Sequence, residues 1–354
     1  MTVLRDCLRT ASATLDSEWE IVALVHDRCL VEEPRVRVIA VPDAKGSWFR
    51  RLSYEWWGFD RLLDGVQIDL WLSLHDITPR VKARRQAVYC HNPAPFYRIT
   101  WREAKLEPRF LLFNAFYLQL YRAFIRRNHT VVVQQAWLRE AFTRLFAHPN
   151  VVVAYPSENS DANSDGADIG RSCIPTALKP LVLLYPSLPR VFKNMDVLCQ
   201  AMSLLPPELK GLVELRLTLS GTENAYSRDL WRRYASVPGV MFIGRQSRAE
   251  MDNQYEHCDV VLFPSKLETW GLPITEAKAR RRPLLVADLP YAHETVGTWD
   301  AVSFLSPHDP RAWAAAIAKI ATGDWHYEGQ TGSQPHSPFA ANWPELWRLL
   351  TDGL

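Results

Sequence analysis

The sequence predicts an α/β fold with two domains in one chain of 354 residues. Short apolar runs rich in β-branched residues alternate with helical segments, which is the pattern of parallel α/β sheets. The length is long for one hydrophobic core and comfortable for two. Residues 158–175 interrupt the alternation with a polar stretch rich in Asn, Ser and Asp, which is typical of a linker. We therefore expect an N-terminal domain over residues 1–157 and a second domain over 176–337.

The first domain is predicted from its periodic apolar segments. Apolar runs predict six strands, at 20–25, 36–41, 68–74, 86–90, 129–135 and 150–156. Apolar residues at helical spacing predict helices over 3–15, 110–125 and 136–146. The chain thus opens on a helix, whereas an α/β domain of this type normally starts with a strand and a glycine-rich turn. We expect that first strand and its loop to be missing from this chain.

The second domain shows the same alternation of strands and helices. Its predicted strands are 180–187, 215–221, 240–245, 260–263 and 282–288, with a last strand and helix within 304–317. The strand at 260–263 is closed by Pro264, and Pro273 suits the first turn of the helix that follows, where its missing N–H costs nothing. This stretch therefore has the order strand, loop, helix.

The entrance of that helix has the chemistry of an anion site. Trp270, Gly271 and Leu272 lie where backbone N–H groups are free and the helix dipole is positive, so a phosphate can bind there. Gly271 leaves room for a ligand close to the backbone. Glu268 precedes the site and Glu276 lies one turn into the helix. The pair fits a nucleotide-sugar, with one carboxylate for the ribose and one for the sugar; alternatively, both are charges that the helix dipole favours.

The run from residue 259 to residue 297 resembles the retaining GT-B glycosyltransferases of family 4 (glycosyl transferases group 1), of the bacterial surface-polysaccharide type. The signature of that family is two glutamates separated by seven residues after a strand, here Glu268 and Glu276, followed by a strand, an aspartate and a Pro-containing loop into a short helix, here from Asp288. One departure is visible, because Arg281 and Arg282 precede Pro283 where the family usually has a Gly. That difference alters a turn rather than the site.

The resemblance implies a fold and an activity. The fold is GT-B, with two Rossmann-like domains facing a cleft, and a C-terminal helix within 338–354 that packs back on the first domain. The activity is retaining transfer of a sugar from a nucleotide-sugar donor to a saccharide or lipid-linked acceptor of a cell-surface polysaccharide. The resemblance implies no metal and no cofactor beyond the nucleotide-sugar co-substrate. The sequence also lacks an Asp-x-Asp motif.

The resemblance also implies donor-binding residues in the second domain. Lys193, at the entrance of a helix, matches a family lysine that neutralises diphosphate oxygens. Arg190 stands in the same loop and replaces an arginine that the family places directly after the strand. Gly244 and Arg245 match a turn that flanks the base and the phosphates. Glu276 matches the carboxylate that holds the ribose.

The catalytic residues implied by the resemblance are Glu268 and His91. Glu268 would orient hydroxyls of the transferred sugar. His91 follows the strand at 86–90 and matches a family histidine near the anomeric carbon, with His75, after the preceding strand, as the second candidate. Both histidines follow the carboxyl ends of strands, where open α/β sheets bind their ligands.

Composition limits the partners and the location. The formal net charge of +2 gives no reason to expect nucleic acid. The six cysteines are scattered, without metal-ligand spacing, as expected for reduced thiols in the cytosol. The first residues do not form a signal peptide. We expect a cytoplasmic protein, with the helix over 110–125 either buried in the first core or lying on an anionic membrane surface.

Three functional alternatives stay open beside glycosyl transfer. A non-catalytic or truncated GT-B protein would fail to bind nucleoside diphosphates. A GT-B nucleotide-sugar epimerase would release nucleotide and sugar without an acceptor. A phosphorylase would need a pyridoxal-binding lysine and a longer chain.

Overall fold

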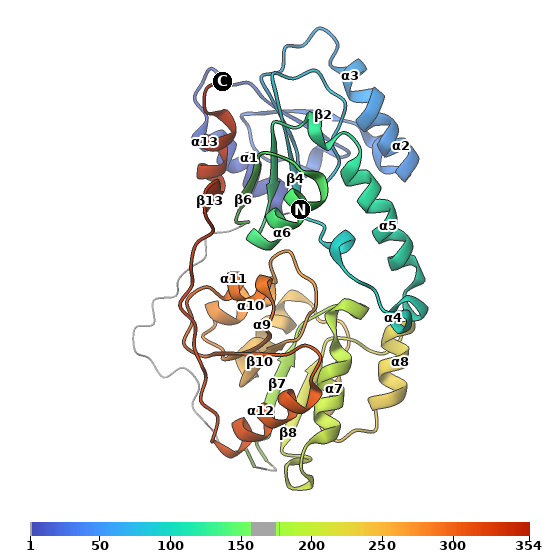
Figure 1. Cartoon of the computed structure of the whole chain (residues 1–354), viewed down its shortest axis with the longest axis vertical. Coiled ribbons are helices and arrows are strands. Elements are labelled where there is room, and N and C mark those ends of the chain that lie inside the picture. Colours follow the sequence, from blue (N-terminus) through green and yellow to red (C-terminus); the bar gives the residue numbers. More distant parts are fainter. Residues whose placement is uncertain (1, 157–174, 177) are drawn as a thin grey trace. The chain divides into compact units, whose positions relative to one another are not determined.

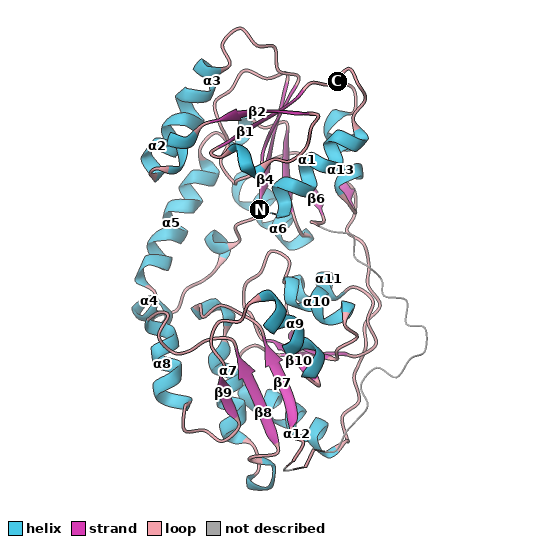
Figure 2. Ribbon diagram, turned by 180° about the vertical axis from the view of Figure 1, so that it is seen from behind, coloured by secondary structure: helices cyan, strands magenta, loops and turns pink. Residues whose placement is uncertain are grey.

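A computed structural model describes residues 2–156, 175–176 and 178–354 of the chain. The chain divides into two compact units. Unit 1 comprises Met1–Phe96, Asn114–Glu158 and Pro335–Leu354, and unit 2 comprises Tyr97–Phe113 and Asn159–Gln334. Nearly all of the expected linker, residues 158–174, lies outside the described residues. The α/β prediction is confirmed in both units (Figures 1 and 2).

Unit 1 contains a five-stranded sheet and a separate two-stranded sheet. The larger sheet has the order β13-β6-β5-β4-β3, all pairs parallel, and β1 pairs in parallel with β2. The strands are β1 (Ile21–Val25), β2 (Val36–Ala40), β3 (Leu70–Ser73), β4 (Arg85–Cys90), β5 (Thr130–Val133), β6 (Val151–Ala154) and β13 (Phe339–Ala340). β5 and β6 are buried along their whole length, as expected for central strands of a parallel sheet covered on both faces.

Helices and short turns complete unit 1. They are α1 (Thr2–Thr14), η1 (Arg28–Leu30), η2 (Pro42–Lys45), α2 (Trp48–Ser53), the π-turn η3 (Tyr54–Gly58), α3 (Phe59–Leu62), η4 (Ala94–Phe96), η5 (Ile125–Arg127), α6 (Ala136–Phe146) and α13 (Trp343–Thr351). The predicted aromatic helix is α5 (Pro108–Arg122), whose first six residues group with unit 2 and the rest with unit 1. Within the described residues, no helix is long and apolar enough to cross a membrane.

The two ends of the described chain share one core in unit 1. Trp347 of α13 donates its indole N–H to the carbonyl oxygen of Cys7 in α1, at 3.1 Å. Trp343 stacks on Tyr89 of β4 with ring centroids 5.5 Å apart. Leu346 and Leu350 fill the same cluster of buried side chains. Residues 335–354 therefore fold as part of unit 1.

Unit 2 is built on a six-stranded parallel sheet. Its order is β12-β11-β10-β7-β8-β9. The strands are β7 (Leu181–Tyr185), β8 (Val213–Leu217), β9 (Val240–Phe242), β10 (Val260–Phe263), β11 (Leu284–Ala287) and β12 (Val302–Leu305). With β7 counted as the first strand, this is the strand order 3-2-1-4-5-6 of the Rossmann fold. The strands stay parallel, but the order in which the chain adds them to the sheet reverses between β7 and β10.

The helices of unit 2 include one that comes from the first half of the sequence. They are α4 (Trp101–Leu106), η6 (Val191–Lys193), α7 (Met195–Leu204), η7 (Pro207–Leu209), α8 (Ala225–Tyr234), α9 (Arg248–His257), α10 (Leu272–Ala279), α11 (Pro290–Val296) and α12 (Pro310–Thr322). Residues 97–113, which the sequence places in the first domain, group with unit 2 because their contacts are with α7, α8 and the loops after β7 and β10.

The packing of α13 predicts that two leucine substitutions on this helix change the free energy of unfolding by different amounts. Leu346→Ala should lower the free energy of unfolding by about 2–5 kcal/mol, because Leu346 is 1% exposed and its loss leaves a cavity in the core of unit 1. Leu349→Ala, at a site that is 42% exposed on the same helix, should change it by less than about 0.5 kcal/mol. Urea unfolding followed by tryptophan fluorescence measures both, and equal effects would contradict this packing.

Candidate functional site

The two loops that follow β7 and β10 form one edge of unit 2. β7 and β10 are adjacent and parallel, so their carboxyl ends lie at the same edge, at the reversal point of the strand order. The loops are joined by hydrogen bonds. The side-chain amide of Asn194 donates to the carbonyl oxygen of Pro264 at 3.1 Å, and the backbone N–H of Lys266 donates to that of Phe192 at 2.7 Å. The predicted donor-binding residues of both loops therefore share one scaffold.

Lys193 and Glu268 come from these two loops and form an ion pair. The Lys193 side chain is 18% exposed and that of Glu268 is 13% exposed, so each charge needs the other. The Lys193 ammonium also lies 5.6 Å from the ring centroid of Phe192 and 5.8 Å from that of Phe263. The structure thus brings together the residue predicted to neutralise diphosphate and the residue predicted to orient the sugar.

The N-terminus of α10 has the backbone conformation expected of a phosphate-binding site. Gly271 takes a left-handed conformation with φ 82°, and a Cβ there would lie 3.2 Å from the ring of Phe263. Gly271 is the N-cap residue and has no side chain with which to cap the first turn of α10. Trp270 is buried and donates its indole N–H to the hydroxyl of Thr275, and its backbone carbonyl oxygen accepts from the hydroxyl of Thr295. The Leu272 side chain is exposed.

Glu276 is bound by α9 through both carboxylate oxygens. Arg248 donates to one oxygen at 2.7 Å and the hydroxyl of Tyr255 donates to the other at 2.9 Å. Burial and the Glu276 carboxylate both raise the pKa of Tyr255, so its hydroxyl keeps the proton that it donates. Neither partner was predicted, since α9 carries no motif that marks them. Glu276 therefore has a fixed orientation.

Gly244 and Arg245 lie at a different position of the same sheet. Gly244 lies two residues after the end of the short strand β9 and has a left-handed backbone with φ 71°. Its N–H donates to the carbonyl oxygen of Leu219 at 3.0 Å. β9 is the edge strand, and β8 separates it from β7. The Arg245 side chain is exposed. The structure places this turn two strands away from the Lys193–Glu268 pair.

In unit 1, His91 follows β4 and is held by the carboxylate of Asp76, which was not predicted from the sequence. Asp76 is 4% exposed and accepts hydrogen bonds from the backbone N–H groups of His91, at 2.6 Å, and Asn92, at 3.1 Å. The hydroxyls of Tyr121 and Tyr117 donate to it at 3.0 and 3.3 Å. The His91 ring lies with Nε2 3.6 Å from the second oxygen. Asp76 therefore fixes both the loop and the ring of His91.

His75 has a similar partner. Its Nε2 contacts a carboxylate oxygen of Glu55, which is 2% exposed and belongs to the π-turn η3. β3 and β4 are neighbours and parallel, so His75 and His91 follow the same edge of the sheet. The adjacency of His75 and Asp76 in the sequence was the available signal for Asp76. Nothing in the sequence marks Glu55, which lies 20 residues from His75.

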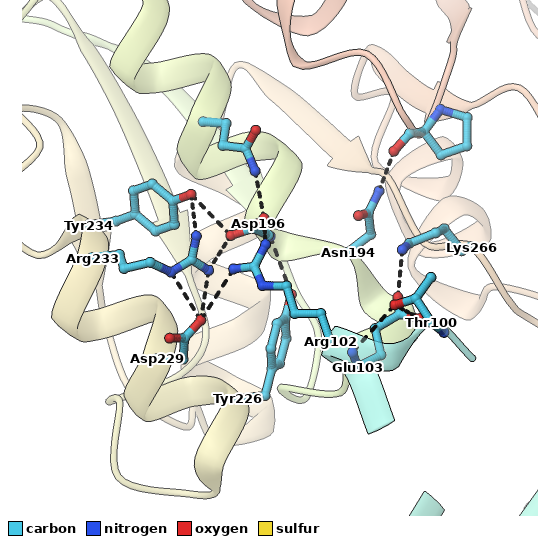
Figure 3. Close-up of polar contacts among 12 residues, drawn as sticks. Thr100, Arg102, Glu103, Asn194, Asp196, Tyr226, Asp229, Arg233, Tyr234 and Lys266 are labelled. Atoms are coloured by element: carbon cyan, nitrogen blue, oxygen red, sulfur yellow. Dashed lines mark hydrogen bonds and ion pairs between the residues drawn. The ribbon is translucent and has the colours of Figure 1, made fainter. Parts of the chain in front are cut away.

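Residues 97–113 contribute further charged side chains to unit 2 (Figure 3). Arg102 lies 3.4 Å from carboxylate oxygens of both Asp196 and Asp229, and Glu103 pairs with Lys266 at 2.7 Å. Burial alone would raise the pKa of the Glu103 carboxyl. Hydrogen bonds from Lys266, Thr100 and Tyr97 have the larger combined effect, so the pKa lies below its usual value. Among the residues that the structure describes, no three His, Cys, Asp or Glu side chains converge in a metal-binding group.

The Asp76 cluster predicts a large effect of a single truncation. Asp76→Ala should lower the free energy of unfolding by about 2–4 kcal/mol, because it removes the acceptor of the His91 backbone N–H. It also removes one of the two partners of the Asn92 backbone N–H and of the buried Tyr121 hydroxyl. Asp64→Ala, at an exposed site of the same unit, should change it by less than about 0.5 kcal/mol. Chemical unfolding measures both, and a neutral Asp76→Ala would refute the described network.

Comparison with known proteins relates most of unit 2 to a glycosyltransferase family and supports the fold of the chain. Residues 176–329 match the family model described as glycosyl transferases group 1. The O-antigen chain mannosyltransferase RfbU of Salmonella typhimurium is 31% identical over 81 residues, 23% of this chain and 22% of that protein. The D-inositol 3-phosphate glycosyltransferase of Stackebrandtia nassauensis is 30% identical over 152 residues, 40% of this chain and 34% of that protein. The chain thus matches about a fifth to a third of the length of these relatives.

Two solved structures cover most of the chain. WaaG, a glycosyltransferase involved in lipopolysaccharide biosynthesis, aligns with a TM-score of 0.57 at 16% identity over 99% of this chain and 92% of WaaG. The sucrose-phosphate synthase of Thermosynechococcus elongatus aligns with a TM-score of 0.60 at 15% identity, over 91% of this chain and 83% of that one. These alignments show the fold. The chain has the GT-B architecture of two Rossmann-like domains, and its residues 176–329 are similar to the glycosyl transferases group 1 family.

Proposed function

We propose that this protein is a retaining glycosyltransferase that moves a sugar from a nucleotide-sugar to a saccharide or lipid-linked acceptor of a cell-surface polysaccharide. The observation that carries the proposal is the Lys193–Glu268 pair beside the uncapped entrance of α10, at the strand reversal of a glycosyl transferases group 1 domain. The relatives support it, since the names of RfbU and of the D-inositol 3-phosphate enzyme are those of glycosyltransferases.

The donor diphosphate is assigned to the loops after β7 and β10. Negative charge develops on the departing nucleoside diphosphate, and groups fixed in advance at that position stabilise it. Lys193, Arg190 and the backbone N–H groups at Gly271 and Leu272 supply the positive charge. They do so without a metal ion in this proposal.

Donor binding changes the partner of Lys193. In the described structure its ammonium is neutralised by Glu268. A diphosphate carries more negative charge than one carboxylate, so it competes for the ammonium when it binds. Glu268 is then available to accept hydrogen bonds from the hydroxyls of the transferred sugar. The same ion pair thus keeps both charges compensated when no donor is bound.

The ribose and the acceptor are assigned to the remaining residues. Glu276 holds ribose hydroxyls with a carboxylate that Arg248 and Tyr255 orient. Gly244 and Arg245 contact the base side of the nucleotide. Unit 1 handles the acceptor, and His91, oriented by Asp76, contacts the sugar near the anomeric carbon.

A peripheral membrane contact is proposed for unit 1, because a lipid-linked acceptor lies in a membrane. A cavity of about 410 Å³ is lined by Arg122, Phe124, Ile125, Arg126, Leu145 and Phe146. Arg122 and Arg126 are exposed. The ring centroid of Trp56 lies 5.7 Å from that of Phe124, and its neighbour Trp57 is 51% exposed. Exposed cations beside aromatic side chains are the composition that binds anionic lipid surfaces.

The donor assignment predicts a selective loss of nucleotide binding. One of UDP, GDP and ADP should raise the melting temperature of the wild type in a buffer with EDTA and no added metal. Lys193→Ala should weaken that nucleotide about 10- to 100-fold, because a charge-assisted contact of about 1.5–3 kcal/mol is lost. Thermal shift and calorimetric titration measure the affinity.

Lys210→Ala serves as the matched control, since Lys210 is exposed in the same unit. It should bind like the wild type. Wild-type protein that binds none of the three nucleotides would refute the donor assignment, and release of free nucleotide and sugar without an acceptor would favour an epimerase.

The membrane assignment predicts a charge-dependent association. Wild-type protein should co-sediment with vesicles containing anionic phosphatidylglycerol, and Arg122→Glu/Arg126→Glu should lose most of that binding, at about 1 kcal/mol per basic residue removed. Lys82→Glu/Arg84→Glu changes the net charge of unit 1 equally, at other exposed sites, and should bind more tightly than the first double variant. Equal binding by both double variants would contradict the assignment.

A further inference from the structure

We infer that Glu107 is a positioning residue for Arg190, and that it presents the Arg190 guanidinium to a phosphate group of the donor. The inference rests on the proposed function, because the phosphate is that of the nucleotide-sugar. Glu107 lies 83 residues before Arg190, in the segment 97–113 that folds with unit 2.

The Glu107 carboxylate uses both oxygens on the loop after β7. One oxygen accepts from Nε of Arg190 at 2.8 Å, and the other accepts from the backbone N–H of Val191 at 3.1 Å. The Glu107 side chain is 10% exposed, so little water competes for these bonds. The carboxylate therefore fixes the side chain and the backbone of the same loop together.

Two aromatic rings lie close to the guanidinium. The Arg190 guanidinium carbon lies 5.1 Å from the ring centroid of Phe110 and 5.5 Å from that of Phe192, and the two centroids are 5.2 Å apart. Cations are attracted to aromatic faces at these distances. Phe110 comes from the same segment as Glu107, one turn away at the start of α5. The segment thus contacts Arg190 through the Glu107 carboxylate and through the ring of Phe110.

The contact leaves the ligand-binding end of Arg190 available. Among the described residues, the two Nη groups of Arg190 make no hydrogen bond, and the side chain is 42% exposed. Arginine binds phosphate most strongly with parallel N–H groups of its planar fork. An inhibitory carboxylate would occupy these Nη groups, whereas Glu107 engages Nε at the side. Glu107 therefore orients Arg190 through Nε and leaves the two Nη groups able to bind an anion.

The segment that carries Glu107 is itself anchored at several points. Thr100 and Glu103 form a capping box at the start of α4, and Glu103 pairs with Lys266. Arg102 reaches Asp196 and Asp229 (Figure 3). Lys266 lies two residues before Glu268, so one segment contacts both loops of the proposed diphosphate site. Its anchoring explains how a residue from the first half of the chain can orient a ligand-binding arginine of unit 2.

The test uses the full chain and the nucleoside diphosphate that stabilises it. Glu107→Gln should weaken that nucleotide about tenfold, because the amide cannot neutralise the guanidinium and presents a donor toward Nε. It should raise the KM for the donor more than it lowers kcat. In the Arg190→Ala background Glu107→Gln should have no further effect on affinity, since Glu107 acts through Arg190. Glu208→Gln, at an exposed site of unit 2, should bind like the wild type.

A second readout does not depend on nucleotide binding. The ¹⁵N NMR spectrum should show a slowly exchanging Arg190 Nε–H signal, assigned by its absence in Arg190→Lys, and Glu107→Gln should lose it. Rapid exchange in the wild type would overturn the inference, as would unchanged affinity of Glu107→Gln. An Nε–H signal in a protein that binds no nucleoside diphosphate would show the ion pair while refuting the proposed function, and with it the role toward phosphate.

Discussion

The parallel pairing of β7 with β10 is the constraint on which the rest of unit 2 depends. The paired positions Leu184 and Val261 are 77 residues apart in sequence, yet the two strands lie side by side because the order of the sheet reverses there. Each strand is followed at its carboxyl end by a loop, and the two loops are neighbours. The chain then leaves these two loops in opposite directions. A loop with two cations and a loop with a carboxylate are thereby placed against each other, which neither loop could achieve alone.

Charge compensation is the second common feature of the site. Lys193 is paired with Glu268, Arg190 with Glu107 and Arg248 with Glu276. A buried charge without a partner costs several kcal/mol, so a site that binds an anionic ligand needs compensation when the ligand is absent. The pairs differ in what they leave free. Glu268 occupies the ammonium that a phosphate would use, whereas Glu107 leaves the Arg190 fork open.

The sequence was sufficient where local pattern decides structure. Short apolar runs located β7 and β10, and Gly271 was selected as a position that leaves room beside the backbone; its left-handed conformation, with φ 82°, was not predicted. Lys193 and Glu268 were selected from a motif, and they meet. Residues that act through long-range contacts were missed. Glu107 and Glu103 lie 83 and 163 residues from their partners, and no periodicity connects such positions. Asp76 and Glu55 were missed because burial of a carboxylate is decided by tertiary packing.

The central claim, that a nucleoside diphosphate binds at the loops after β7 and β10, is tested most directly by hydrogen–deuterium exchange of the full chain with and without the nucleotide. If the nucleotide binds there, exchange should slow in residues 187–194 and at the α10 entrance, residues 268–274, with little change at β12 or in α12. Protection confined to other parts of unit 2, with these two loops unchanged, would contradict it.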